Sequence, residues 1–392
     1  MGRRVSYFPL ALTLVFLAAA AAATVANAMY NVESYGAKAD GRTDSSAAFL
    51  KAWDAACELN RPATIFVPRG EFLLRNVLFR GEKCGNRNGI TLQISGTLLA
   101  PSDYNVIGHS DAWIKFNRVT AVSIIGGTLD AQGSSLWNCK NHGKGGCPEG
   151  STTLAIYDSD NVAITGLTSQ NSQKFHILIR GTRNAKLQGV KISAPEDSPN
   201  TDGIHVQSSS GVTITNSNIG TGDDCISIGP GTTNLLVQSI ACGPGHGISI
   251  GSLGWSAQEA GVENVKVRNV QFTGTENGVR IKTWARPSNG YVRNVLFQRA
   301  TMVDVHNPII IDQNYCPHNE NCPHQSSGIK ISGITFEDIH GTSATEVGVE
   351  LQCSKSRPCS GITVDDVKLT YNGRPAEASC TNAACPRIFS RY

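Results

Sequence analysis

The sequence lacks several features that would point to particular functions. No CxxC pair occurs among its twelve cysteines, which argues against a zinc site. Charge of neither sign is in large excess, because the formal net charge is only +3. Residues 1–28 carry two arginines and no acid, so without them the charge falls to about +1. A near-neutral chain has no global field to attract nucleic acid or a membrane surface, and an acidic ligand must meet local basic residues.

The chain also lacks a second long apolar run and any Asn-x-Ser/Thr acceptor for N-glycosylation. Its one long run, Val5 to Val25, follows two arginines and precedes Ala26-Asn27-Ala28, the small-x-small pattern that signal peptidase cuts. We therefore interpret residues 1–28 as a signal peptide and expect a secreted protein with no membrane contact after cleavage. The alternative is a membrane anchor, because the run is nearly long enough to span a bilayer.

The cysteine content suits an oxidising compartment, since twelve is an even number. The nearest-neighbour pairing is one connectivity among many, and sequence alone cannot prove it. It joins Cys57 with Cys84, Cys139 with Cys147, Cys225 with Cys242, Cys316 with Cys322, Cys353 with Cys359 and Cys380 with Cys385.

A short phrase with two alternating apolar stretches recurs along the chain, for example "VTITNSNIG" from Val212 and "ITVDDVKLT" from Ile362. Recurrence indicates a solenoid, period-two alternation indicates strands, and forty glycines suit many tight corners. Residues 29–392 show no linker, so we predict one all-β domain, a parallel β-helix of about ten turns. The alternative is a β-sandwich, but few Asn-Gly or Asp-Gly turns separate the alternating runs.

The segment from Ser45 to Leu59 is rich in helix formers and has apolar residues at helical spacing. We predict an amphipathic helix that covers the N-terminal end of the solenoid and has no binding role. Asp44 or Ser45 could serve as its N-cap.

A second series of strand-like segments begins at "DGIHV", "DCISI", "HGISI" and "NGVRIK". Alignment by their apolar pairs places Asp202, Asp224, His246 and Asn277 at the same position, and the first three are 22 residues apart. Successive coils of a solenoid lie about 4.8 Å apart. Asp202, Asp224 and His246 should therefore form a column where the strands begin.

The same alternation indicates which side chains leave the apolar interior. Asp223 has outward parity, whereas Asp224 reaches the outer face only if the alternation lapses at the bend. The other outward residues of this series are His205, Ser227, Ser249, Arg280 and Lys282.

Neighbouring carboxylates raise the free-energy cost of ionising one another, so three acids on neighbouring coils indicate a functional role. Paired carboxylates act as general acid and general base across a glycosidic bond. In inverting enzymes the two groups stand roughly 6.5–9.5 Å apart, a gap that one to two coils would span. Arg280 and Lys282 could then hold an anionic sugar through charge-assisted hydrogen bonds.

Four segments resemble, in order, the motifs of the polygalacturonases, family 28 of the glycoside hydrolases, in their plant form. They are "SPNTDGIHV" at 198–206, "GTGDDCISIGPG" at 220–231, "CGPGHGISIGSLG" at 242–254 and "RIK" at 280–282. The likeness also includes "DGRTD" at 40–44 and "NYC" at 314–316, and it runs across nearly the whole mature chain.

The resemblance implies a right-handed parallel β-helix and inverting hydrolysis of α-1,4-linked galacturonic acid in pectin. By position, Asp223 resembles the general acid, Asp202 and Asp224 the pair that activates water, and His246 the residue that keeps the acid correctly protonated. Arg280 and Lys282 resemble clamps on the substrate carboxylate, with Asn200 and Tyr315 as further lining. We expect no cofactor or metal, homogalacturonan in the cell wall as the partner, and a monomer.

Two other functions stay open at this point. A pectate lyase is also a parallel β-helix, and its calcium could be held by the aspartates. A non-catalytic wall-binding β-helix would need the groove but no acid and base. Endo and exo attack are equally open, and the inserts at 138–150 and 316–328 are expected to form walls of the groove.

Overall fold

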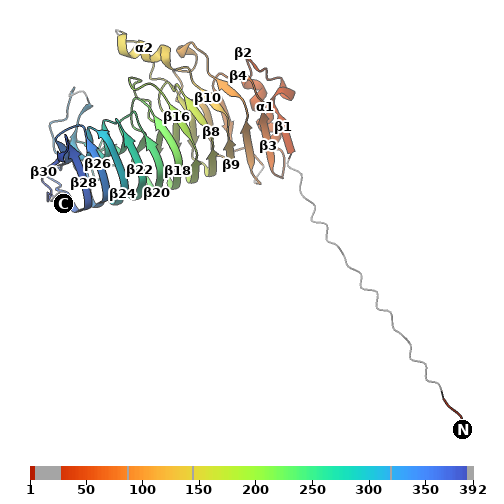
Figure 1. The fold of residues 1–392 in the computed structure, drawn as a ribbon. Helices are drawn as coiled ribbons and strands as arrows, with labels where there is room; N and C mark the ends of the chain where they lie inside the picture. The colour runs from red at the N-terminus through yellow and green to blue at the C-terminus, as the bar shows by residue number, and fades with distance from the viewer. Residues whose placement is uncertain (5–27, 86–87, 144, 318–319, 386–392) are drawn as a thin grey trace.

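The chain is described here by a computed structural model that covers residues 1–4, 28–85, 88–143, 145–317 and 320–385. Its strands stack in chain order into one elongated parallel solenoid (Figure 1). The coils wind in the right-handed sense that parallel crossover connections take. Within the described residues, no helix is long and apolar enough to cross a membrane. Residues 5–27 of the predicted signal peptide lie outside the described part of the chain, so that assignment stays a prediction.

The recurring apolar phrases of the sequence form the larger of two sheets. Among the described residues it has nineteen strands. They are β1 (Ala28–Asn31), β2 (Asp40–Asp44), β3 (Ala63–Val67), β4 (Glu71–Leu73), β6 (Ile90–Ile94), β7 (Thr97–Leu99), β9 (Thr120–Ile125), β10 (Thr128–Asp130), β12 (Asp160–Thr165), β13 (Thr168–Gln170), β15 (Arg183–Gln188), β16 (Lys191–Ser193), β18 (Ser210–Gly220), β20 (Thr233–Cys242), β22 (Val262–Thr273), β24 (Tyr291–Val305), β26 (Lys330–Ser343), β28 (Ser360–Tyr371) and β29 (Arg374–Pro375).

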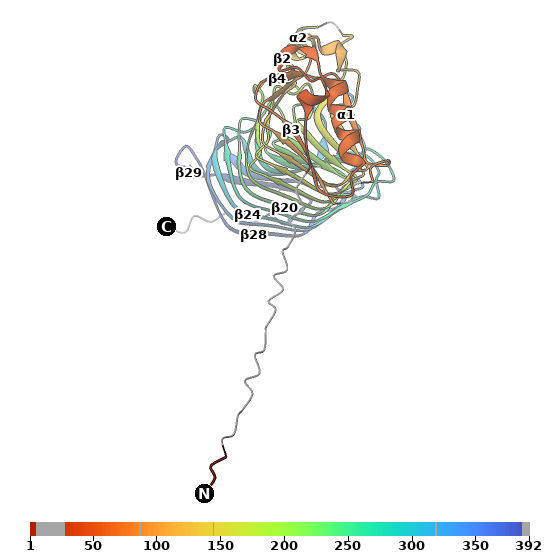
Figure 2. The ribbon, with the colours of Figure 1, turned by 90° about the vertical axis from the view of Figure 1, so that its right-hand side faces the viewer.

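The second series of the sequence belongs to a smaller sheet, with eleven strands in the described residues. They are β5 (Val77–Arg80), β8 (Ala112–Asn117), β11 (Thr152–Tyr157), β14 (Ile177–Arg180), β17 (Ile204–Gln207), β19 (Ile226–Ile228), β21 (Ile248–Leu253), β23 (Asn277–Trp284), β25 (Asn307–Tyr315), β27 (Val347–Gln352) and β30 (Glu377–Thr381). The view of Figure 2 shows the stacked coils curling around a common interior. The predicted parallel β-helix is confirmed, and the β-sandwich is excluded.

Burial of alternate residues fixes the register between coils. Ile204 pairs with Ile226, Ile226 with Ile248, and Ile248 with Val279, as the alignment of apolar pairs predicts. These four side chains are at most 1% exposed. Burying each one contributes about 1.5–3 kcal/mol. A shift of the strand register by one residue would turn all four of these side chains to solvent. The register therefore also fixes how the residues next to them stack from coil to coil.

Asparagines support the bend that leads into the larger sheet. Asn161, Asn184, Asn234, Asn264 and Asn294 lie near the starts of β12, β15, β20, β22 and β24 and have φ between 53° and 58°. The intervening strand β18 has Gly211 at this place, with φ of 70°. Asparagine tolerates this left-handed conformation better than most residues. The side-chain amide of Asn184 donates to Asn161 over 3.2 Å, and that of Asn264 donates to Asn234 over 3.2 Å. The bend therefore repeats along the solenoid, with side-chain amides paired between neighbouring coils on either side of β18.

Helices lie at one end and along one side of the solenoid. The helix expected near residue 45 is α1 (Ser46–Cys57), which packs on β1, β3 and β5 at the N-terminal end (Figure 1). Ser45 occupies its N-cap position, but the capping oxygen comes from Asp44, which accepts from the Ser46 N–H over 3.0 Å. The other elements are α2 (Ser134–His142), η1 (Val32–Tyr35) and η2 (Tyr104–Val106).

All six nearest-neighbour disulfides predicted from the sequence are present. The bridge between Cys225 and Cys242 lies inside the solenoid, where both residues are at most 2% exposed. It ties the residue after Asp224 to the end of β20, and so fixes the start of β19.

Removal of this buried bridge should destabilise the protein strongly. The paired changes Cys225→Ala and Cys242→Ala are expected to lower the free energy of unfolding by about 3 kcal/mol, because the bridge closes a loop of 17 residues. Urea denaturation measures the change. The matched control removes Cys139 and Cys147, which close a loop of only 8 residues in the insert after β10. A loss no larger than that of the control pair would contradict this role.

Candidate active site

Four neighbouring strands of the smaller sheet, β17, β19, β21 and β23, carry the residues singled out in the sequence. Asp202 and Asp224 stand two residues before β17 and β19, and His246 stands two residues before β21. The in-register pairing of these strands places the three residues on successive coils. The predicted column is therefore present at the bends that open the strands.

Asp224 is the most deeply buried acid of the column, with 1% of its surface exposed. Its Oδ1 accepts from the Ser249 hydroxyl over 2.7 Å and from Arg280 Nη2 over 2.8 Å. Its Oδ2 accepts from Lys282 Nζ over 2.8 Å. All three donors are outward-facing side chains, so the alternation does lapse at the bend and Asp224 reaches the outer face.

The two cations decide the ionisation of Asp224. Burial alone would raise the pKa of this carboxyl, but the charges of Lys282 and Arg280 outweigh it and lower the pKa to about 2. The cations are themselves only 6% and 8% exposed. The sequence indicated Arg280 and Lys282 as substrate clamps, and it did not predict that they also hold a neighbouring acid ionised.

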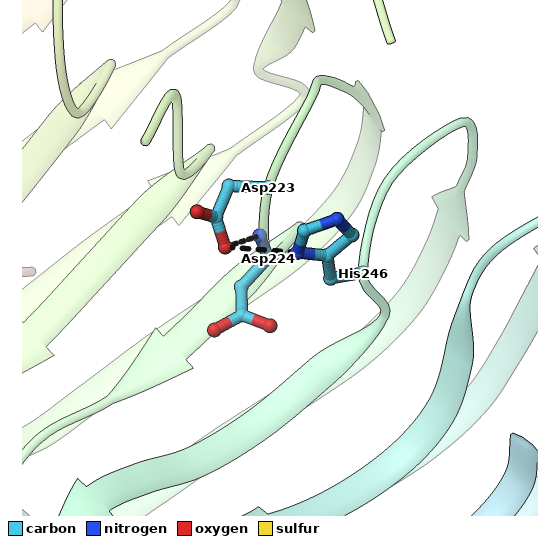
Figure 3. A group of neighbouring side chains, drawn as sticks. All are labelled: Asp223, Asp224 and His246. Carbon is cyan, nitrogen blue, oxygen red and sulfur yellow. Dashed lines mark hydrogen bonds and ion pairs between the residues drawn. The ribbon is translucent and has the colours of Figure 1, made fainter. Parts of the chain in front are cut away.

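Asp223 has different partners from those of Asp224. Its Oδ1 lies 3.2 Å from Nδ1 of His246 and accepts from the backbone N–H of Asp224 over 2.7 Å. Asn200 donates to the other oxygen over 3.4 Å. The carboxylate of Asp223 and the imidazole point toward one another, while the Asp224 side chain extends in another direction (Figure 3).

Asp202 is joined to a histidine through a serine. The Ser227 hydroxyl donates to Oδ2 of Asp202 over 2.5 Å and lies 2.7 Å from Nδ1 of His205. Burial raises the pKa of Asp202 well above its usual range, and the negative charges of Asp223 and Asp224 raise it further. Burial lowers the pKa of His205 to about 4, so this imidazole is neutral and its Nδ1–H can donate to the serine.

Glu276 is a partner of the site that the sequence analysis missed. Its Oε2 lies 3.2 Å from Nε2 of His246, so the imidazole is held between two carboxylates. Burial works to lower the pKa of His246, but the hydrogen bond and charge of Asp223, helped by Glu276 and Asp224, raise it. A signal was available, since Glu276 precedes Asn277 as Asp223 precedes Asp224 in the aligned segments.

Glu276→Gln should lower the pKa of His246, because it removes a charge that favours the protonated imidazole and keeps the shape of the side chain. The other acids that face the ring, Asp223 and Asp224, stay in place. An NMR titration of the imidazole protons measures the shift. Asp223→Asn should shift the pKa in the same direction and further, and Glu337→Gln, on β26 of the other sheet, should leave it unchanged. An unchanged or higher pKa in Glu276→Gln would contradict the contact.

The column lies in a cleft made of adjoining cavities. A cavity of about 580 Å³ is lined by Asp202, Asp223, Asp224, Lys282 and Tyr315 together with other residues. A second cavity of about 510 Å³ shares Asn200, Asp223 and Tyr315 with the first and adds His246 and Arg280. All eight predicted site residues therefore meet in one cleft, and the ring of Tyr315 lies 5.2 Å from Lys282 Nζ.

The insert at 316–328 borders this cleft, as expected from the sequence, whereas the insert at 138–150 borders a neighbouring cavity. Pro317, in the insert at 316–328, lines the cavity beside His246. Glu149, at the end of the other insert, lines a third cavity that shares Phe175 and His205 with the first. Glu149 forms an ion pair at 2.8 Å with Lys174, which lines the same third cavity.

Comparisons with known proteins agree with this arrangement. Residues 57–388 match the model of the glycosyl hydrolases family 28. The chain belongs to this family. A polygalacturonase of Prunus persica is 58% identical over 384 residues, which cover 98% of this chain and 96% of that protein. An exopolygalacturonase of Platanus acerifolia is 42% identical over 358 residues, covering 90% and 94%.

Solved structures of lower sequence identity show the same fold. Endo-xylogalacturonan hydrolase of Aspergillus tubingensis superposes with a TM-score of 0.81 at 24% identity, covering 93% of this chain and 98% of that one. The resemblance stated from the motifs is thus confirmed, and the family 28 chain is a glycoside hydrolase.

In this family 28 hydrolase the donor set does not fit calcium. One oxygen each of Asp223 and Asp224 and a nitrogen of His246 lie within 4.8 Å of one another. Calcium takes six to eight oxygen ligands. Here one ligand is an imidazole, and both oxygens of Asp224 already accept from Arg280 and Lys282.

Asp223 and Asp224 bring one carboxylate oxygen each within 4.8 Å of each other. The reason is the bend, which turns two adjacent side chains to the same face of the sheet.

Proposed function

We propose that this family 28 hydrolase is a polygalacturonase that cleaves α-1,4-galacturonosyl linkages by a single displacement with inversion. One observation carries the proposal: two adjacent acids in one cleft have opposite surroundings. Asp224 is paired with Arg280 and Lys282, whereas Asp223 is paired with His246 and Asn200. Carboxyl groups with environments this different are suited to separate roles as base and acid. The family and the 58% identical polygalacturonase support the substrate.

Asp223 acts as the general acid and protonates the oxygen of the leaving sugar. It faces two cavities of the cleft, so a glycosidic oxygen can reach it from either. His246, whose pKa is raised, stays protonated and donates to Asp223. In this role His246 orients the acid and stabilises the carboxylate that forms once the proton has left.

Asp202 and Asp224 hold the attacking water one coil apart, about 4.8 Å. Asp224, with a pKa of about 2, is ionised at every pH at which the enzyme is expected to work and accepts the proton of the water. Asp202, whose pKa is raised, donates a hydrogen bond to the same water and orients it.

Arg280 and Lys282 have a second role at the substrate carboxylate. Lys282 donates one of its three N–H groups to Asp224. Arg280 donates from Nε to Ser249 and from Nη2 to Asp224. Their remaining N–H groups can bind a galacturonate carboxylate bidentately or as a point charge. Tyr315 and Asn200 complete the lining next to this sugar.

We further propose that the enzyme is secreted to the cell wall and acts there on pectin as a monomer. Six disulfides support an oxidising compartment, and the leader-like residues 1–28 support secretion. The mode of attack is read from the products of a long oligogalacturonate, since endo attack gives a ladder and exo attack gives only the monomer.

The test of the proposed function is digestion of polygalacturonate with and without a chelator. The expected result is a rise in reducing ends, unchanged by chelator, without an unsaturated product that absorbs in the ultraviolet. An ultraviolet-absorbing product that disappears with chelator would instead identify a calcium-dependent lyase. Binding without any release of reducing ends would identify a non-catalytic wall protein.

A further inference from the structure

An exposed tryptophan stands in the same cleft as the catalytic acids. Trp255 follows β21 and is 59% exposed, the highest value among the described tryptophans. It lines the 580 Å³ cavity together with Asp223 and Lys282. Large aromatic side chains are usually covered when nothing binds to them. An indole left open beside a reaction centre is therefore a candidate for substrate contact.

Trp255 is the outer end of a row of aromatic rings. Its ring centroid lies 5.2 Å from that of Trp284, and the ring of Trp284 lies 5.3 Å from that of Tyr315. Trp284 and Tyr315 are register partners at the ends of β23 and β25. Lys282 Nζ lies 5.2 Å from the ring of Tyr315. The row thus leads from the proposed substrate clamp to the exposed indole.

A cation is held against this row. The guanidinium carbon of Arg286 lies 4.1 Å from the ring centroid of Trp255 and 5.5 Å from that of Trp284. In the part of the chain that the structure describes, no carboxylate lies within ion-pair distance of Arg286. Stacking orients the planar guanidinium and leaves its N–H edge free for an anion.

The loop that carries Trp255 is fixed by one acid. The carboxylate of Glu259 accepts from the backbone N–H groups of Gly254, Trp255 and Ser256 over 2.5, 3.1 and 3.4 Å. The N–H of Glu259 itself donates to Asn289 over 2.9 Å. The indole is thus held in place before any ligand arrives, which lowers the entropic cost of binding.

We propose that Trp255 and Arg286 form a sugar-binding subsite for a second, de-esterified galacturonate unit of the same chain. The C–H face of the pyranose packs on the open part of the indole, and its carboxylate binds the guanidinium edge. The subsite rests on the proposed function, because the sugar bound there belongs to the polymer being cleaved. A methyl ester or a neutral sugar at this position keeps the packing and loses the ion pair.

Binding of oligogalacturonates of increasing length, measured by calorimetry in an Asp223→Asn background, tests the subsite without turnover. Trp255→Ala should weaken binding about three- to tenfold for oligomers long enough to reach the indole, and leave the shortest binder unchanged. Trp255→Phe should retain most of the affinity. Arg286→Gln should weaken binding of the acidic oligomer about tenfold and leave its methyl ester unaffected.

The matched control is Arg293→Gln. Its guanidinium carbon lies 4.6 Å from the ring of Tyr291 in the larger sheet, outside the cleft, so affinity should not change. Wild-type affinity in Trp255→Ala at every length, or an equal loss for the shortest and longest oligomers, would overturn the subsite while leaving the proposed function intact. No binding by the parent protein would overturn both.

Discussion

Asp223→Asn is expected to lower kcat on polygalacturonate by about 10²–10⁴-fold, the usual contribution of a general acid. The amide keeps the size of the side chain and cannot donate the proton that the leaving oxygen needs. KM should change little, because Arg280 and Lys282 still bind the substrate carboxylate. Steady-state kinetics on polygalacturonate measures both constants.

An activated substrate separates loss of the acid from loss of structure. An aryl galacturonide with a good leaving group needs little protonation, so Asp223→Asn should cleave it at a rate close to that of the unaltered enzyme. His246→Ala should show a smaller loss on polygalacturonate and the same partial rescue, since His246 acts through Asp223. Near wild-type turnover of polygalacturonate by both variants would show that the acid lies elsewhere.

Lys282→Met is expected to damage two functions at once. It removes one of the two cations that hold the pKa of Asp224 at about 2. The pKa of Asp224 should then rise by about one to three units, and a base that must be ionised is lost at a higher pH than before. The acid limb of the kcat/KM–pH profile should move upward by that amount, with about a tenfold loss per pH unit below the limb.

The substrate distinguishes the two roles of Lys282. Movement of the acid limb reports the contact with Asp224 and should occur on charged and methyl-esterified polymers alike. Loss of the clamp should raise KM on the demethylated polymer more than on the esterified one. Lys282→Arg keeps the charge and should preserve the position of the acid limb. An unmoved limb in Lys282→Met would contradict the first role, and equal losses on both polymers would contradict the second.

Much of this arrangement is readable in the sequence because burial fixes it. Ile204, Ile226 and Ile248 must alternate into the interior, so their alignment gives the stacking of Asp202, Asp224 and His246 directly. The nearest-neighbour disulfide pairing was one connectivity among many in the sequence, and the structure contains all six of its bridges. The alternation of inward and outward side chains gives a wrong prediction only at the bend. There it predicts that Asp224 points into the interior, whereas this side chain reaches the outer face.

Side-chain contacts between residues two coils apart could not be predicted from the sequence. Arg280 and Lys282 reach Asp224 from 56 and 58 residues away, two coils along the sheet. Their sequence position indicates an outward face and says nothing about which acid they pair with. Trp255 and Arg286 were missed because they lie on loops after β21 and β23, where no period governs the direction of a side chain.

The anomeric configuration of the first product shows whether water attacks the sugar directly. We propose that Asp202 and Asp224 hold a water molecule that displaces the leaving sugar in one step. Proton NMR during the first minutes of digestion should show the new reducing end as the β anomer, before mutarotation. An initial α anomer would mean that a carboxylate attacks the sugar first, and would contradict direct attack by water.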